Sequence, residues 1–83
     1  MDETEHTEHD RARREMVHTA QTFEGLYEVL NKIGMVKDTG RMYPPARLIE
    51  SIEGVRKGTV TMGFIPRTYG LREKVSSLLG TQK

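Results

Sequence analysis

This chain of 83 residues contains no cysteine, no tryptophan and only five aromatic side chains. Without cysteine it can form no disulfide, no cysteine-ligated zinc site and no thiol nucleophile. The absence also agrees with a reducing compartment. A domain this small buries a modest share of its surface. Since no disulfide supports its core, we expect a homodimer formed through the first predicted helix.

Long apolar runs are also missing. A helix that crosses a bilayer needs about 18–20 consecutive, mostly apolar residues, and no stretch of this chain approaches that length. The N-terminus is acidic and has no apolar core of the kind that signal peptides carry. These absences predict no membrane association and a cytoplasmic location.

Charge is distributed unevenly along the chain. Five of the twelve acids lie within the first ten residues, where there is no Lys or Arg, so the remainder carries all 13 bases against seven acids. Residues 1–9 have no aliphatic side chain after Met1 and are expected to form a disordered acidic leader. The predicted organisation is this leader, a single helical domain at 10–80 and a short tail at 81–83.

The spacing of apolar residues predicts the first helix at 10–33, with Asp10 as its N-cap. Thr22 is a second capping residue within this span and would divide the helix into two parts. Gly34 follows the last apolar residue and is expected to end the helix.

Two further helices are predicted, at 45–57 and 68–79. Pro45 suits the first turn of the former and Gly58 its end, while Thr68 and Gly80 bound the latter. Between the first two helices, Asp38-Thr39-Gly40 has the composition of a hairpin turn. Residues 59–65 are β-branched and aromatic, which is typical of a short strand or an extended connector.

The expected fold is therefore mainly α: a small three-helix domain with a short β-hairpin or strand pair and a disordered acidic N-terminus. Within it, Tyr69-Gly70-Leu71 resembles the turn of helix-turn-helix proteins, although Pro66 interrupts the helix that should precede the turn. That resemblance implies that Arg72 and Lys74 begin a DNA-recognition helix.

The predicted nucleic-acid contacts lie between residues 56 and 74, where five bases accompany a single acid, Glu73. A basic surface of this kind docks on phosphates, and nearby Tyr43 or Tyr69 could stack on bases. Arg41 and Arg47 would extend the surface if the fold brought them to the same face. The predicted contacts are Arg56, Lys57, Arg67, Arg72 and Lys74, of which Arg72 and Lys74 lie off the apolar face and are expected to be dispensable for folding.

No catalytic signature is present, whether a phosphate-binding glycine loop, a serine nucleophile motif or a cysteine nucleophile. His6, His9 and His18 are too few, and too poorly pre-positioned, for a structural metal site. We therefore expect a protein that is not an enzyme and that needs no cofactor and no metal.

Two functions remain open. The first is a small, non-catalytic, intracellular nucleic-acid-binding or regulatory protein that docks DNA or RNA through a basic face, with the acidic leader competing for that face. The second is a protein-interaction module, an adaptor or inhibitor, that uses the amphipathic first helix. Its contacts would be Phe23, Tyr27 and Leu30, and their exposure discriminates between the two.

Overall fold

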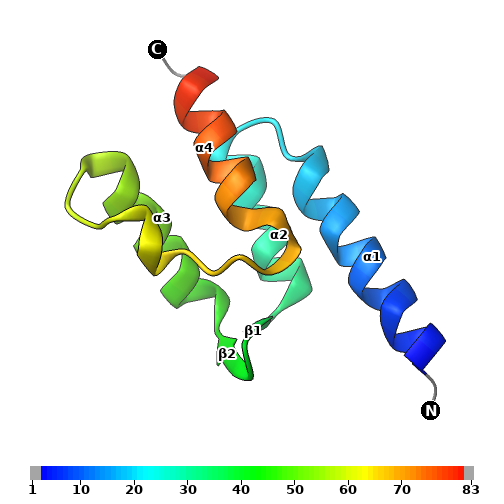
Figure 1. Ribbon diagram of the computed structural model, residues 1–83. Coiled ribbons are helices and arrows are strands. Elements are labelled where there is room, and N and C mark those ends of the chain that lie inside the picture. Colours follow the sequence, from blue (N-terminus) through cyan, green and yellow to red (C-terminus); the bar gives the residue numbers. More distant parts are fainter. Residues whose placement is uncertain (1–2, 82–83) are drawn as a thin grey trace.

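The computed structural model describes the backbone of residues 3–81 and the side chains of residues 11–37 and 39–80. Within this range the chain is mainly helical, as predicted, with one two-stranded antiparallel sheet (Figure 1). The elements in chain order are α1 (Glu3–Thr19), α2 (Phe23–Ile33), β1 (Val36–Asp38), β2 (Arg41–Tyr43), α3 (Pro45–Lys57), the 3-10 turns η1 (Met62–Phe64) and η2 (Thr68–Gly70), and α4 (Leu71–Thr81).

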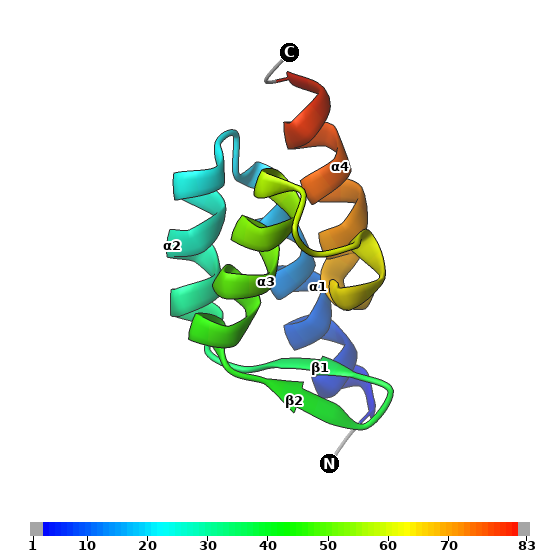
Figure 2. The ribbon, with the colours of Figure 1, turned by 90° about the vertical axis from the view of Figure 1, so that its left-hand side faces the viewer.

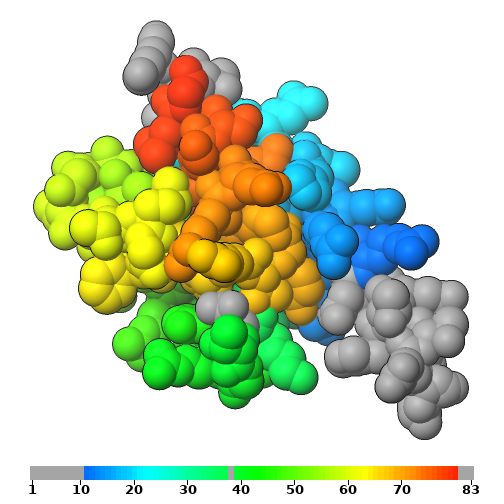
Figure 3. Space-filling view, viewed as in Figure 1, coloured from blue at the N-terminus to red at the C-terminus, as the bar shows by residue number. Residues whose placement is uncertain are grey.

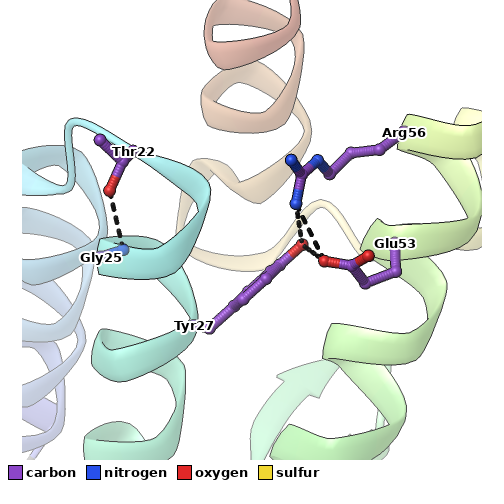
Figure 4. A network of polar contacts seen from close by, with 5 residues as sticks. All are labelled: Thr22, Gly25, Tyr27, Glu53 and Arg56. Atoms are coloured by element: carbon purple, nitrogen blue, oxygen red, sulfur yellow. Dashed lines mark hydrogen bonds and ion pairs between the residues drawn. The ribbon is translucent and has the colours of Figure 1, made fainter.

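The helix predicted at 10–33 is two helices, so the described chain has four α-helices instead of three. Thr22 causes the break, because its backbone is extended and its hydroxyl accepts a hydrogen bond from the Gly25 N–H at 3.0 Å (Figure 4). Its predicted capping role is confirmed. Helix α1 begins at Glu3, so Asp10 lies inside the helix and does not cap it. The side chains of the leader lie outside the described residues, and its disorder stays a prediction.

A β-hairpin joins α2 to α3 and lies across one end of the helices (Figure 2). Strands β1 and β2 pair Asp38 opposite Arg41, leaving Thr39 and Gly40 as a two-residue turn. Both turn residues have positive φ, 47° and 83°, which a type I′ turn requires. The predicted hairpin is therefore confirmed.

Helix α3 has the boundaries that the sequence predicts. Pro44 precedes it, Pro45 occupies its first turn, and Gly58 ends it in the left-handed conformation. The following segment is not a strand, because the Gly54 carbonyl accepts hydrogen bonds from the N–H groups of Thr59 and Val60 at 2.8 and 3.1 Å. These contacts fold the segment back on α3 before η1 begins.

Helix α4 begins at Leu71, after the η2 turn, and includes Gly80, which was expected to end it. No α-helix leads into the Tyr69-Gly70 turn: between the end of α3 at Lys57 and Leu71 the chain forms only two 3-10 turns and extended connections. The helix-turn-helix hypothesis is therefore wrong for this segment.

A single apolar core lies between the helices, and its buried residues come from all four of them, with Val36 from the hairpin and Ile65 and Tyr69 from the connecting segment. The apolar faces of α1 and α2 pack into this core, since Val17, Leu26 and Leu30 are fully buried. The homodimer stays a prediction, but the apolar stripe on which it was based is covered within one chain.

Candidate nucleic-acid interface

The five predicted nucleic-acid contacts do not form one free basic face. Arg56 belongs to a polar network between α2 and α3 (Figure 4). The Tyr27 hydroxyl donates to Glu53 Oε2 at 2.5 Å, and Arg56 Nη1 donates to the same oxygen at 2.9 Å. The Arg56 guanidinium also lies 4.3 Å from the centre of the Phe23 ring, a cation–π contact. Arg56 therefore serves to join two helices.

The same network shifts two ionisation equilibria. Burial raises the pKa of the Tyr27 hydroxyl, and its hydrogen bond to the Glu53 carboxylate raises it further. Conversely, the hydrogen bond from Tyr27, supported by the charge of Arg56, lowers the pKa of Glu53. The network is thus most stable with Glu53 ionised and Tyr27 neutral.

Arg72 and Lys74 are held by backbone carbonyls from distant parts of the chain. Arg72 donates from Nε to the Ile65 carbonyl at 2.5 Å and from Nη2 to the Gly63 carbonyl at 3.1 Å. Lys74 Nζ donates to the carbonyls of His18 and Ala20, at 2.9 and 2.7 Å, where α1 ends. These hydrogen bonds indicate that both side chains support the fold, whereas the sequence pattern predicts that they are dispensable for it; stability measurements on the variants decide between the two.

Lys57 and Arg67 are exposed but lie on different elements, Lys57 in the last turn of α3 and Arg67 just before η2. Arg67 borders a depression of about 650 Å³ where α1 meets the start of α4, hereafter the α1–α4 depression. Of the side chains that the structure describes, three arginines, a histidine and one acid, Glu73, line it. Its lining residues are Arg14, His18, Arg67, Thr68, Tyr69, Gly70, Arg72 and Glu73.

The Tyr69-Gly70 turn forms the floor of this depression. Tyr69 has a left-handed backbone, at φ 59° and ψ 17°, and its ring is buried. A Cβ atom on Gly70 would lie 3.1 Å from His18 Nε2, so the turn is packed closely on α1. Arg13 adds a long hydrogen bond to the Tyr69 hydroxyl, at 3.4 Å.

A second depression, hereafter the hairpin groove, lies between β2, the first half of α3 and η1, and measures about 720 Å³. In Figure 3 the connecting segment that contains η1 borders the hairpin. Among the described side chains, two arginines line the groove together with exposed apolar residues, and no acid does. Its lining residues are Arg41, Met42, Tyr43, Arg47, Ser51, Gly63, Phe64 and Pro66.

The two depressions share one stretch of chain. Gly63, Phe64 and Pro66 line the hairpin groove, and residues 67–70 continue into the α1–α4 depression. Four arginines along these two sites form no hydrogen bond or ion pair with any side chain or backbone group that the structure describes: Arg14, Arg41, Arg47 and Arg67. Arg67 is the one member of this group that belongs to the set predicted from the sequence, and Arg14, Arg41 and Arg47 join it.

Sequence reasoning noted Arg41, Arg47 and Tyr43 but missed Phe64. The sequence feature that could have identified Phe64 is its position between Gly63 and the Ile65-Pro66 pair, in a connector too short to bury every side chain. Its exposed fraction is 67%, the largest among the exposed large apolar residues.

The predicted protein-interaction residues are not accessible as a set. Phe23 and Leu30 are fully buried in the core, and Tyr27 is half-buried in the network with Glu53. An adaptor that docks through this stripe would have to open its own core. Among the described residues, the exposed large apolar side chains lie elsewhere, at Met16, Met35, Met42 and Phe64.

Within the described part of the chain, no three His, Cys, Asp or Glu side chains are grouped so that they could hold a metal ion. His6 and His9 lie outside the described side chains. None of the described helices combines the length and apolarity needed to span a bilayer.

Comparison with protein families, curated proteins and solved structures found no match to this chain.

Proposed function

We propose that this protein is a small, non-catalytic nucleic-acid-binding module that docks phosphates on the surface formed by the hairpin groove and the α1–α4 depression. The observation that carries the proposal is the set of four arginines, Arg14, Arg41, Arg47 and Arg67, that border these depressions without a partner among the described groups. Guanidinium groups pair with phosphate oxygens in a bidentate geometry and release counterions on binding.

Charge separates this surface from the rest of the domain. Among the residues that the structure describes, the walls of the hairpin groove contain two arginines and no carboxylate, so these residues attract a phosphate without repelling it. By contrast, Arg56 on the opposite half of α3 is already neutralised by Glu53. A polyanion is therefore expected to bind Arg41 and Arg47 at the groove in preference to Arg56, whose charge is paired with Glu53.

The frame of the surface is rigid enough to present these cations. Val36 and Ile65 anchor the hairpin and the connecting segment in the core, and the Thr68 hydroxyl donates to the Lys37 carbonyl, which ties the two together. Groups on anchored elements lose less entropy on binding than groups on free loops.

The test is fluorescence anisotropy of labelled mixed-sequence 20-mers of DNA and RNA, titrated with the full chain over a range of salt concentrations. Binding should weaken steeply with salt, and the double variant Arg41→Gln/Arg47→Gln should reduce the salt slope by about 1.4–1.8 if two phosphate contacts are lost. The matched control is Lys32→Gln/Lys57→Gln, which removes the same charge from residues that line neither depression.

An equal loss of affinity in the two double variants would contradict a localised interface. Lys57 is one of the contacts predicted from the sequence, whereas Arg41 and Arg47 belong to the contacts proposed from the structure. The double variant that loses more affinity therefore shows which of these two sets binds nucleic acid. Absence of binding at low salt would eliminate the proposal. Deleting residues 1–9 should tighten binding, since the acidic leader competes for the same cations.

One observation supports the alternative function, protein interaction. Met42 and Phe64 are 51% and 67% exposed, and both line the hairpin groove. Methionine and aromatic side chains are common in protein docking surfaces. If the titrations show no nucleic-acid binding, this groove, and not the buried face of α2, is the place to search for a protein contact.

A further inference from the structure

We infer that the hairpin groove takes single-stranded nucleic acid, with an unpaired base stacked on Phe64 and the neighbouring phosphates on Arg41 and Arg47. The inference rests on the proposed function and names the class of nucleic acid that this site selects. Four features carry it. They are the exposure of one ring, the hydrogen bonds that hold its backbone, the cations and rings that line the groove, and the engagement of the α4 side chains that would be needed to read a duplex.

Phe64 is an exposed ring within an anchored segment. It is 67% exposed, whereas Ile65 and Pro66, which follow it directly, are buried. The η1 turn produces this arrangement, since the Phe64 and Ile65 N–H groups donate to the carbonyls of Thr61 and Met62. The ring is therefore directed outward by the backbone while its neighbours enter the core.

Arg72 holds the backbone on both sides of this ring. Its two hydrogen bonds end on the carbonyls of Gly63 and Ile65, the residues immediately before and after Phe64. A guanidinium that bridges two carbonyls in this way restricts the segment between them. Arg72 therefore acts as a positioning residue for Phe64 and is not itself a contact to nucleic acid.

The groove combines cations with apolar surface, as a single strand combines phosphates with bases. Proteins that bind single strands combine a basic groove with aromatic rings on which bases stack. In the hairpin groove Arg41 and Arg47 supply the charge, and Phe64 from η1 and Tyr43 from β2 supply ring surface. Charge complementarity and ring exposure thus point to the same occupant.

Duplex reading by α4 is disfavoured for a separate reason. A helix that enters the major groove needs polar side chains free to reach base edges. Arg72 and Lys74, at the start of α4, are both held by backbone carbonyls. Stacking on Phe64 also requires a base that is already unpaired, which a duplex does not offer.

The absence of tryptophan allows a direct test. In the full chain, Phe64→Trp places the only tryptophan at the proposed stacking position, where it can be excited selectively over tyrosine, and stacking on a base should quench its emission when oligo(dT) or a mixed-sequence single strand is added. The matched control is Met16→Trp, an exposed position on α1 that lines neither depression. Its emission should change little.

Affinity measurements separate stacking from charge. Phe64→Leu should weaken single-strand binding by about 5-fold or more with an unchanged salt slope, because it removes a ring and no charge. Duplex of the same length should bind more weakly than single strand to the parent protein, and Phe64→Leu should leave duplex binding unchanged.

Arg72→Gln tests the positioning role. It should weaken single-strand binding without lowering the salt slope, and its effect should largely disappear in the Phe64→Leu background. A lower salt slope would instead make Arg72 a phosphate contact and overturn the positioning role. Circular dichroism and thermal melts of each variant confirm that the domain is folded under the assay conditions.

The outcomes distinguish the two proposals. No binding of either nucleic acid at low salt removes the proposed function and this inference with it. Binding that is equal for single strand and duplex, or an unquenched tryptophan at position 64, overturns the inference alone and leaves a phosphate-docking surface without strand selectivity.

Discussion

Replacing Lys74 with methionine tests whether its ammonium group holds α1 and α4 together. Lys74→Met keeps an apolar stem of similar length and removes only the charged donor. That donor bonds the carbonyls of His18 and Ala20 at 2.9 and 2.7 Å, and these groups lie at the end of α1, where carbonyls lack partners within the helix. The variant should therefore be less stable than the parent protein.

The magnitude follows from the environment of these bonds. A hydrogen bond to a charged group contributes about 1.5–3 kcal/mol when well shielded. The Lys74 side chain is only half-buried, and both carbonyls can be hydrated when it is removed, so we expect a total loss of about 1–2 kcal/mol. For a domain of this size each kcal/mol changes Tm by about 4–8 °C.

The assay is urea and thermal unfolding followed by circular dichroism at pH 7, with Lys32→Met as the control. Lys32 lies in the last turn of α2 and has no hydrogen-bond partner among the described groups, so its replacement should cost about a few tenths of a kcal/mol. The loss in Lys74→Met should persist in high salt, since its acceptors are neutral carbonyls. Equal midpoints for the two variants would refute the reasoning.

Four further outcomes are expected. Gly54→Ala should lower the free energy of unfolding by about 1–2 kcal/mol, because the added Cβ would lie 2.3 Å from Val60 Cγ2. In the control Gly80→Ala the added Cβ would have no atom within 4 Å, so this variant should be as stable as the parent protein or more stable in the same melts. The hydroxyl of Tyr27 should ionise above its ordinary pKa, so in an alkaline titration of tyrosine absorbance at 295 nm the step at highest pH should be missing in Tyr27→Phe. The stability that this neutral hydroxyl contributes should be lost as the pH rises through its raised pKa. The lowered pKa of Glu53 works in the opposite direction: Glu53→Gln should destabilise the protein at neutral pH, and its difference from the parent should vanish as the pH falls through the pKa of the folded state. Deleting residues 1–9 should leave Tm nearly unchanged, because these residues include no aliphatic side chain after Met1, and a large drop would show that the leader packs on the domain.

The sequence by itself determined the secondary structure where the signals are local. A threonine hydroxyl three residues from its acceptor N–H, a proline in the first turn of a helix and a glycine at its left-handed end each act within a few residues. Thr22, Pro45 and Gly58 therefore have the roles that sequence analysis predicts, and so does the hairpin turn at Thr39-Gly40. The apolar periodicity likewise identified Phe23 and Leu30 as members of one face, although it left open whether that face meets a partner or the protein's own core.

Only the tertiary structure decided where the long basic side chains end. Lys74 reaches carbonyls 54 and 56 residues away, and Arg72 reaches back across η2 to the two residues that flank Phe64. A flexible side chain with several donors takes whichever acceptors the packed chain places within reach, and no local pattern encodes that choice. The same packing directs Phe64 outward and brings it beside Arg41 and Arg47, so the candidate site exists only because the connector between α3 and α4 folds against the hairpin.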